Sequence, residues 1–123
     1  MLTRESAKGE IFDKLDSLKM KKGCQEKLTS DLGYLHDNGY LVLIDKIYLF
    51  GSCSKGKETY KSDIDLGIVT KTPIPRKVKA DIRGELTDPT QFGIETNCVF
   101  IQSKNLDLNI RLHREIVNGI RLY

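Results

Sequence analysis

The chain has 123 residues, of which 39% are hydrophobic and 30% are charged, and its net charge is +3. This length suits one domain with one modest hydrophobic core, so residues 1–123 are expected to form a single domain. The charge is too small to indicate extended nucleic-acid binding, and no apolar run approaches the roughly 20 residues of a membrane span. Because the N-terminus also lacks a signal-peptide core, we expect a cytoplasmic protein.

The three cysteines are Cys24, Cys53 and Cys98, and they lie far apart in the sequence. Their odd number and the lack of Cys-x-x-Cys spacing argue against a disulfide framework or a zinc site. Cys53 follows Ser52 directly, but a tolerated small side chain is a simpler interpretation than a chemical role. The cysteines therefore suggest no function.

Two helices are predicted in the first third of the chain. The first spans residues 3–20, ends at Gly23 and forms an N-terminal helical extension over residues 1–23. The second spans residues 24–37, because apolar residues recur there at helical spacing, and Asn38-Gly39 is expected to end it with a left-handed cap. A strand then follows at about residues 46–50, and residues 52–57 could form one helical turn.

The rest of the chain alternates between strands and helices. Residues 63–70 form a second strand, which alternates little and so is expected to be buried on both faces. Pro75 opens a helix with an inward face of Val78, Ile82 and Leu86. Residues 92–101 form a third strand. A last helix covers about residues 105–118, an extended tail follows, and the inward residues of this helix are expected to be Leu108, Leu112, Ile116 and Val117.

These elements together predict an α/β fold, in which a small mixed β-sheet has helices packed against it. No internal repeat, low-complexity tract or linker interrupts the chain. His36 and His113 lie on predicted helices with no neighbour that would make either one a catalyst. The chemistry must therefore be sought elsewhere.

Two aspartates open the second strand. Asp63 and Asp65 are two positions apart, so in an extended strand their side chains share a face. Two carboxylates so close repel each other unless a cation lies between them, and oxygen ligands suit Mg²⁺ or Mn²⁺. The preceding strand ends at Gly51-Ser52, where small residues let backbone N–H groups approach a phosphate.

This stretch resembles the signature of the nucleotidyltransferase superfamily that includes DNA polymerase β. The matching pattern is Leu49-Phe50-Gly51-Ser52, a gap of ten residues, and Asp63-Ile64-Asp65 followed by an apolar run. The short chain points to the minimal nucleotidyltransferases, with Lys55 where arginine is more common. The resemblance extends over roughly residues 25–123, and it implies a polymerase β-like fold.

The resemblance also implies a role for each residue of the motif. Asp63 and Asp65 would be catalytic ligands of Mg²⁺, while Gly51, Ser52 and Lys55 would bind the phosphates of ATP. The superfamily usually adds a third carboxylate from a neighbouring strand, which completes the metal cage or accepts the proton of the attacking hydroxyl.

The candidate for this third carboxylate is Glu95. It follows a predicted helix and precedes an apolar strand. Aspartate is more common at this position, and Thr96-Asn97 is more polar than the family pattern. If Glu95 does not fill the role, activity would be weak while nucleotide binding would survive.

The implied reaction is transfer of AMP from ATP to a hydroxyl group with release of pyrophosphate. Many minimal nucleotidyltransferases resemble antitoxins whose partner is a HEPN-domain toxin, and the acceptor would be a tyrosine of that toxin. One alternative is a small-molecule acceptor such as an aminoglycoside, for which a homo-oligomer would build the acceptor pocket. Another is a binding module that grips its partner with little or no catalysis.

Overall fold

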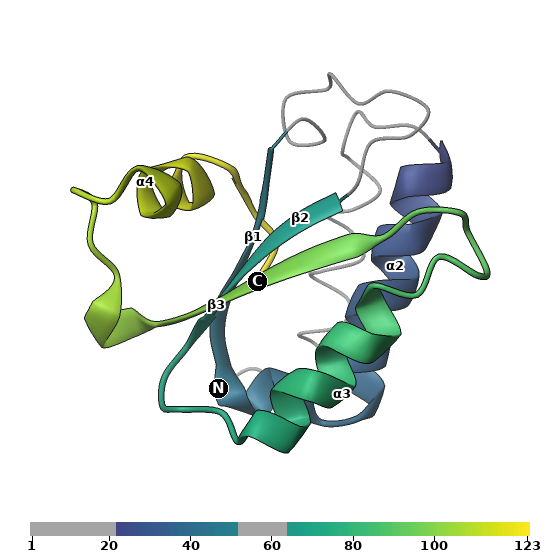
Figure 1. The fold of residues 1–123 in the computed structure, drawn as a ribbon, viewed down its shortest axis with the longest axis horizontal. Coiled ribbons are helices and arrows are strands. Elements are labelled where there is room, and N and C mark those ends of the chain that lie inside the picture. Colours follow the sequence, from purple (N-terminus) through teal and green to yellow (C-terminus); the bar gives the residue numbers. More distant parts are fainter. Residues whose placement is uncertain (1–21, 52–63) are drawn as a thin grey trace.

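The computed structural model describes residues 22–51 and 64–123 of the chain, and the predicted helix at 3–20 and helical turn at 52–57 lie outside these ranges. Helices and strands alternate along the described chain as the sequence predicted (Figure 1). The elements are α2 (Lys22–Asp37), the 3₁₀ helix η1 (Tyr40–Leu43), β1 (Ile44–Phe50), β2 (Ile64–Thr70), α3 (Arg76–Leu86), β3 (Thr96–Gln102), the 3₁₀ helix η3 (Ser103–Asn105), α4 (Arg111–Val117) and β4 (Ile120–Arg121).

The strands form one mixed sheet in the order β3-β2-β1-β4. Strand β1 is antiparallel to both of its neighbours, whereas β2 and β3 are parallel and are joined through α3. The predicted extended tail is in fact an edge strand, because Ile120 and Arg121 pair with β1. The predicted mixed α/β sheet is confirmed.

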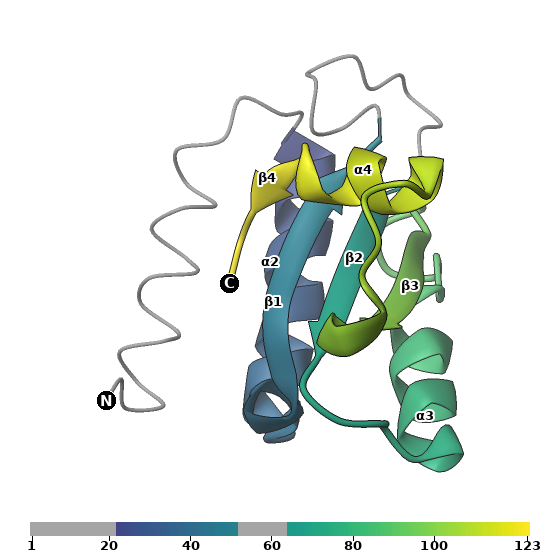
Figure 2. The same ribbon diagram turned by 90° about the vertical axis from the view of Figure 1, so that its left-hand side faces the viewer.

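Helices cover the two faces of the sheet unequally. Figures 1 and 2 show the strands between α2 and α3 on one side and α4 on the other. Ile64, Leu66 and Ile68 of β2 belong to the core cluster under α2 and α3, while Val69 belongs to a smaller cluster with Ile116 of α4. The apolar run of β2 is therefore buried on both faces, as predicted.

Glycine and proline set most of the helix ends where the sequence placed them. Helix α2 ends at Asp37, and Gly39 adopts φ 74° just beyond it, the left-handed conformation that glycine allows. Pro75 precedes the first residue of α3. Gly23 is an exception, because it lies inside α2 and does not end an earlier helix at that point.

The predicted last helix is too long and partly misoriented. Residues 103–110 form η3 and turns before α4, and Leu108 and Leu112 are 57% and 40% exposed instead of facing inward. Local hydrogen bonds stabilise the non-helical path: Asp107 Oδ1 accepts the Asn109 N–H, and the Asp107 N–H donates to His113 Nδ1. Ile116 alone among the four predicted inward residues is fully buried.

The third strand begins four residues later than the predicted range of 92–101. Gly93 adopts φ 70°, and its N–H donates to the Pro89 carbonyl at 2.7 Å, so the chain turns here before it extends. Strand β3 consequently starts at Thr96, which places Glu95 immediately before the strand.

Candidate functional site

Gly51, the residue that follows β1, lies close to the carboxylate of Asp65, the second residue of β2. Phe50 pairs with Asp65 across the antiparallel strands, and Gly51 follows with φ 77°. A Cβ atom added to Gly51 would lie 2.5 Å from Asp65 Oδ2, closer than atoms can approach without displacement. Glycine is therefore required here both for its backbone conformation and for its lack of a side chain.

The exposure and orientation of Asp65 follow from its place near the start of β2. It is half-buried, and by strand alternation it faces the same side as Gly67 and Val69, the side on which α4 packs. Gly67 lets α4 come close, since a Cβ there would lie 2.4 Å from Ile116 Cγ2. The Asp65 carboxylate is thus partly open to solvent beside a closely packed surface.

Three of the predicted site residues, Ser52, Lys55 and Asp63, lie outside the described residues. The structure therefore places Gly51, Asp65 and Glu95 only. It brings Gly51 and Asp65 together, and the catalytic and binding roles of all six stay predictions.

Glu95 lies level with the start of β2. Its carbonyl accepts the Ile64 N–H at 3.0 Å, and its side chain is exposed. The parallel register then places Thr96 beside Ile64 and Asn97 beside Asp65. The predicted third carboxylate is therefore close to the strand start, but it is not the residue directly alongside Asp65.

The residue alongside Asp65 is Asn97, which is not among the site residues predicted from the sequence. Its side chain is exposed, and residues in parallel register project from the same face of a sheet. Asn97 also precedes the apolar run Cys98-Val99-Phe100-Ile101, which is a signal for the first exposed position of a buried strand. The sequence does not encode the register, however, and only the strand pairing identifies Asn97 as the residue alongside Asp65.

The oxygen atoms near the start of β2 fit a hard divalent cation. Asp65 and Glu95 offer carboxylates and Asn97 offers an amide oxygen, the donor types that Mg²⁺ and Mn²⁺ accept. Within residues 22–51 and 64–123, no three His, Cys, Asp or Glu side chains gather closely enough to hold a metal ion. A complete carboxylate set would therefore need Asp63.

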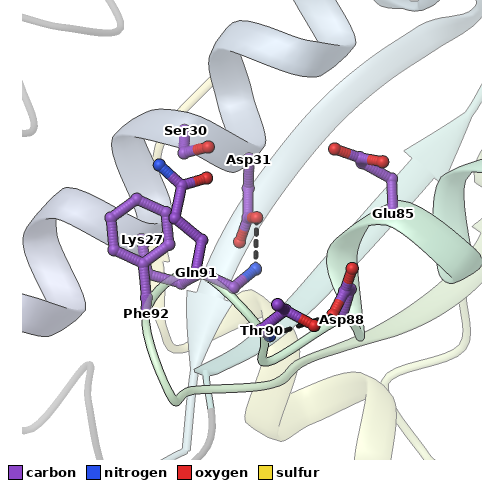
Figure 3. A pocket seen from close by; sticks show the side chains of 8 residues that line it. All are labelled: Lys27, Ser30, Asp31, Glu85, Asp88, Thr90, Gln91 and Phe92. Atoms are coloured by element: carbon purple, nitrogen blue, oxygen red, sulfur yellow. Dashed lines mark hydrogen bonds and ion pairs between the residues drawn. The ribbon is translucent and has the colours of Figure 1, made fainter.

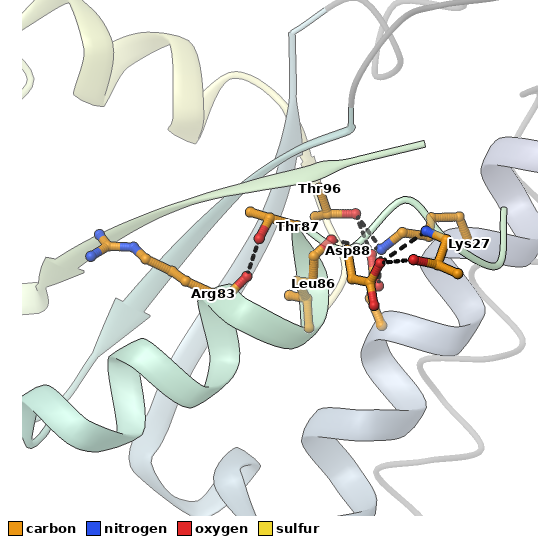
Figure 4. A network of polar contacts seen from close by, with 8 residues as sticks. Lys27, Arg83, Leu86, Thr87, Asp88 and Thr96 are labelled. Atoms are coloured by element: carbon orange, nitrogen blue, oxygen red, sulfur yellow. Dashed lines mark hydrogen bonds and ion pairs between the residues drawn. The ribbon is translucent and has the colours of Figure 1, made fainter. Parts of the chain in front are cut away.

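On the opposite face of β3, a buried polar network surrounds Thr96 (Figure 4). Lys27 Nζ of α2 donates to Asp31 Oδ1 at 2.5 Å, to Thr96 Oγ1 at 3.1 Å and to the Leu86 carbonyl at 2.8 Å. The Thr96 hydroxyl in turn donates to Asp31 Oδ2. Burial raises the pKa of Asp31, while the hydrogen bonds from Lys27 and Thr96 oppose that rise.

A pocket of about 220 Å³ opens next to this network (Figure 3). Lys27 and Asp31 line it from α2, Glu85 lines it from α3, and Asp88 and Phe92 line it from the loop before β3. The hydroxyl of Thr90 in this loop donates to Asp88 Oδ1 at 2.5 Å. The pocket lies on the α2 side of the sheet, so it is separate from the Asp65 carboxylate.

Two further side chains with possible reactivity, Cys98 and His36, are half-buried and buried. Burial raises the pKa of the Cys98 thiol to about 12, so this cysteine is not a nucleophile at neutral pH. His36 is buried, with Nδ1 at 3.0 Å from Asp37 Oδ1. Among the described helices, none is long and apolar enough to cross a membrane.

Three solved structures with a similar fold are toxin–antitoxin complexes. A mutant of the MntA–HpeT complex aligns with a TM-score of 0.53 at 19% identity, covering 75% of this chain and 68% of that one. A toxin–antitoxin complex with AMP-PNP aligns with a TM-score of 0.54 at 20% identity, covering 80% and 71%. A second MntA–HpeT mutant gives 0.52 at 22% identity, covering 75% and 68%. At these identities the likeness shows a shared fold.

The sequence itself assigns the family. No curated protein matches the chain at a significant level. The family model described as "Polymerase beta, Nucleotidyltransferase" matches residues 39–123, which include Gly51, Ser52, both aspartates and the four strands of the described residues. The chain therefore belongs to the polymerase β family of nucleotidyltransferases.

Proposed function

We propose that this nucleotidyltransferase moves AMP from ATP to a hydroxyl group of a protein toxin and thereby acts as its antitoxin. The acceptor we propose is a tyrosine of a HEPN-domain toxin. The observation that carries the proposal is the contact of Gly51 with the Asp65 carboxylate, which unites the two halves of the family motif.

The names of the structural neighbours support the choice of nucleotide and partner. One neighbour is a toxin–antitoxin complex with AMP-PNP, an analogue of ATP. Another carries two aspartate-to-glutamate changes two positions apart, the spacing of Asp63 and Asp65, and a third carries a tyrosine-to-alanine change. An antitoxin that transfers AMP to tyrosine would make both kinds of position important.

The carboxylates are proposed to bind the divalent ion and to accept the proton of the acceptor hydroxyl. Asp63 and Asp65 would bind Mg²⁺, and Glu95 would complete the site or accept the proton of the attacking hydroxyl. When bound, Mg²⁺ neutralises charge that develops on the phosphate oxygens during in-line displacement. Asp65 is only half-buried, so we propose that a phosphate can reach its carboxylate from solvent.

The turn after β1 is proposed to bind the phosphates. Gly51 lets the backbone pass close to Asp65, so the following N–H groups would lie near any ion that Asp65 binds. Ser52 would add a hydroxyl donor, and Lys55 would add positive charge. Binding by backbone N–H groups needs no base-specific contact, so it does not determine which nucleotide is used.

A second candidate is a partner-binding module with weak catalysis. The observation in its favour is Asn97, since the position alongside Asp65 carries an amide where a third carboxylate would bind the metal more strongly. The two candidates differ in their dependence on the aspartates: transfer requires them, and binding alone does not.

A label-transfer assay tests the proposal. The protein is incubated with Mg²⁺ and ATP labelled at the α-phosphate, with and without a candidate HEPN-domain partner. We expect label on the partner with the wild-type protein and none with Asp63→Asn or Asp65→Asn. Asp81→Asn, an exposed change of the same chemistry on α3, is the matched control. A stable complex without label would contradict the transferase proposal and favour the binding module.

A further inference from the structure

One residue at the start of β3 connects the candidate site with a buried network on the other face of the sheet. Thr96 is fully buried and points toward α2, while its neighbours Glu95 and Asn97 are exposed. The same short stretch therefore presents polar groups to the site and a hydroxyl to the interior. Whatever holds Thr96 in place also sets the level of Glu95 and Asn97.

The hydroxyl of Thr96 is held from two directions. It accepts a hydrogen bond from Lys27 and donates one to Asp31, and both partners are less than 5% exposed, at 2% and 4%. Lys27 also binds the Leu86 carbonyl at the end of α3. The network thus ties α2, the end of α3 and the start of β3 to one point.

A network of charged groups is an unusual way to fasten these elements. Apolar contacts would bury the same surface, but they would tolerate sliding along the strand more readily than hydrogen bonds that require defined distances and angles. Sliding by one residue would carry Asn97 to the opposite face of the sheet, away from Asp65. Directional bonds to Thr96 oppose that change of register.

We propose that Thr96 is a positioning residue for the candidate transferase site, held by Lys27 and Asp31 so that Glu95 and Asn97 remain level with Asp65. This inference rests on the proposed function, since the site that Thr96 positions is the proposed metal and nucleotide site. It goes beyond that function because neither Thr96 nor its two partners touches the reacting groups.

The hydrogen bond from the Ile64 N–H to the Glu95 carbonyl provides a direct reporter. It lies between the start of β2 and the residue before β3, at 3.0 Å, and amide exchange measures how often it opens. The Leu122 N–H, bonded to the Ile47 carbonyl at 2.7 Å, is a reference at the other edge of the sheet.

The experiment compares three variants of the full chain by amide exchange and by Mn²⁺ binding. Thr96→Val removes the hydroxyl at nearly constant shape, and Thr96→Ser keeps a hydroxyl. Thr70→Val makes the same change at another buried threonine, at the far end of β2. We expect Thr96→Val to speed Ile64 exchange about tenfold while leaving Leu122 unchanged, and to weaken Mn²⁺ binding. Thr96→Ser should keep Ile64 exchange and Mn²⁺ binding close to those of the wild type, and Thr70→Val should change neither of these two readouts.

Two results would overturn the proposal. An equal rise in exchange at Ile64 and Leu122 would mean that Thr96 only contributes to global stability, and unchanged Ile64 exchange would mean that it does not hold the strand start. If Thr96→Val does not fold, Asp31→Asn provides the same comparison. Neither readout requires AMP transfer, so a wild-type protein that labels no partner would contradict the proposed function without affecting this result.

Discussion

The two faces of the sheet are built differently at the point where β2 and β3 begin. On the α2 side, Lys27, Asp31 and Thr96 are buried and bonded to one another. On the α4 side, Asp65 is half-buried and Asn97 is exposed. The polar groups on the α2 face are therefore buried and bonded to one another within the protein, whereas those on the α4 face are at least partly exposed to solvent.

The difference follows from the helices that cover each face. Helices α2 and α3 have 16 and 11 residues and bury a continuous core, but α4 has only seven and packs over Gly67 through Ile116. Within the part of the chain that the structure describes, this short helix leaves Asp65 near the start of β2 only half-buried. Solvent access at Asp65 is thus a consequence of the fold, and polar chemistry can occur there without the cost of burying a charge.

The largest effect should come from the side of the sheet on which α4 packs, which we call the open face. Asp65→Asn keeps the shape of the side chain and removes its charge, so we expect AMP transfer to a partner protein to fall by about 10³-fold or more. The thermal midpoint should change little, since the residue is only half-buried. Initial rates with labelled ATP and a melting curve check both points. Retention of more than a tenth of the rate would contradict a metal-binding role.

The next largest effect should be a loss of stability, from a change on the α2 side of the sheet, which we call the closed face. Lys27→Met leaves the Asp31 carboxylate buried without its cation, and we expect the free energy of unfolding to fall by about 3–5 kcal/mol. The double variant Lys27→Met with Asp31→Leu should recover most of this loss, because no unpaired charge remains. Urea unfolding measures the free energy of unfolding of the wild type, the single variant and the double variant. Equal losses in the single and double variants would mean that packing, not charge, is responsible.

The same pair gives a pH dependence. Burial raises the pKa of Asp31 above its unfolded value of 3.8, so the folded state binds this proton more tightly than the unfolded state does. The contribution of Asp31 therefore favours folding at low pH and is lost as pH rises above 3.8 toward the raised value. Because Lys27→Met removes a group that opposes the rise, the deficit of this variant should be smaller at pH 4 than at pH 7. A deficit that is constant with pH would contradict this account.

The contact between β1 and β2 can be broken without changing any charge. Gly51→Ala would place a methyl group against Asp65 Oδ2, so we expect transfer to fall about 10²-fold through displacement of the carboxylate. Gly39→Ala is the matched control, since Gly39 has a similar φ of 74° but no atom within 4 Å of an added Cβ. Equal loss of activity in both variants would assign the effect to backbone strain alone.

Local patterns predicted the elements whose ends are marked by local chemistry. The Gly39 and Pro75 boundaries of α2 and α3 and the doubly buried β2 could be read from the sequence because each depends on a few neighbouring residues. The region after β3 could not, since the turns around Asp107 depend on side-chain to backbone bonds that compete with a strong apolar period.

The site shows the same limit. The motif containing Gly51 and Asp65 could be recognised because its residues are close in sequence and their spacing is distinctive. The pairing of Asp65 with Asn97 depends on the register of two strands separated by a helix, and no local pattern encodes it. The Thr96 network was not predictable for the same reason, because its partners are 65 and 69 residues away.

Asn97 offers the smallest change and the sharpest test of the open face. Asn97→Asp places a carboxylate alongside Asp65, so we expect Mn²⁺ to bind about tenfold more tightly in a titration followed by electron paramagnetic resonance. Asn105→Asp adds the same charge at an exposed position beyond the other end of β3 and should have no effect. If both variants bind alike, the gain is general electrostatics. If Asn97→Asp alone gains Mn²⁺ affinity and also gains transfer rate, the Asn97 amide limits metal binding in the wild type. This one side chain would then account for weak catalysis by the natural protein.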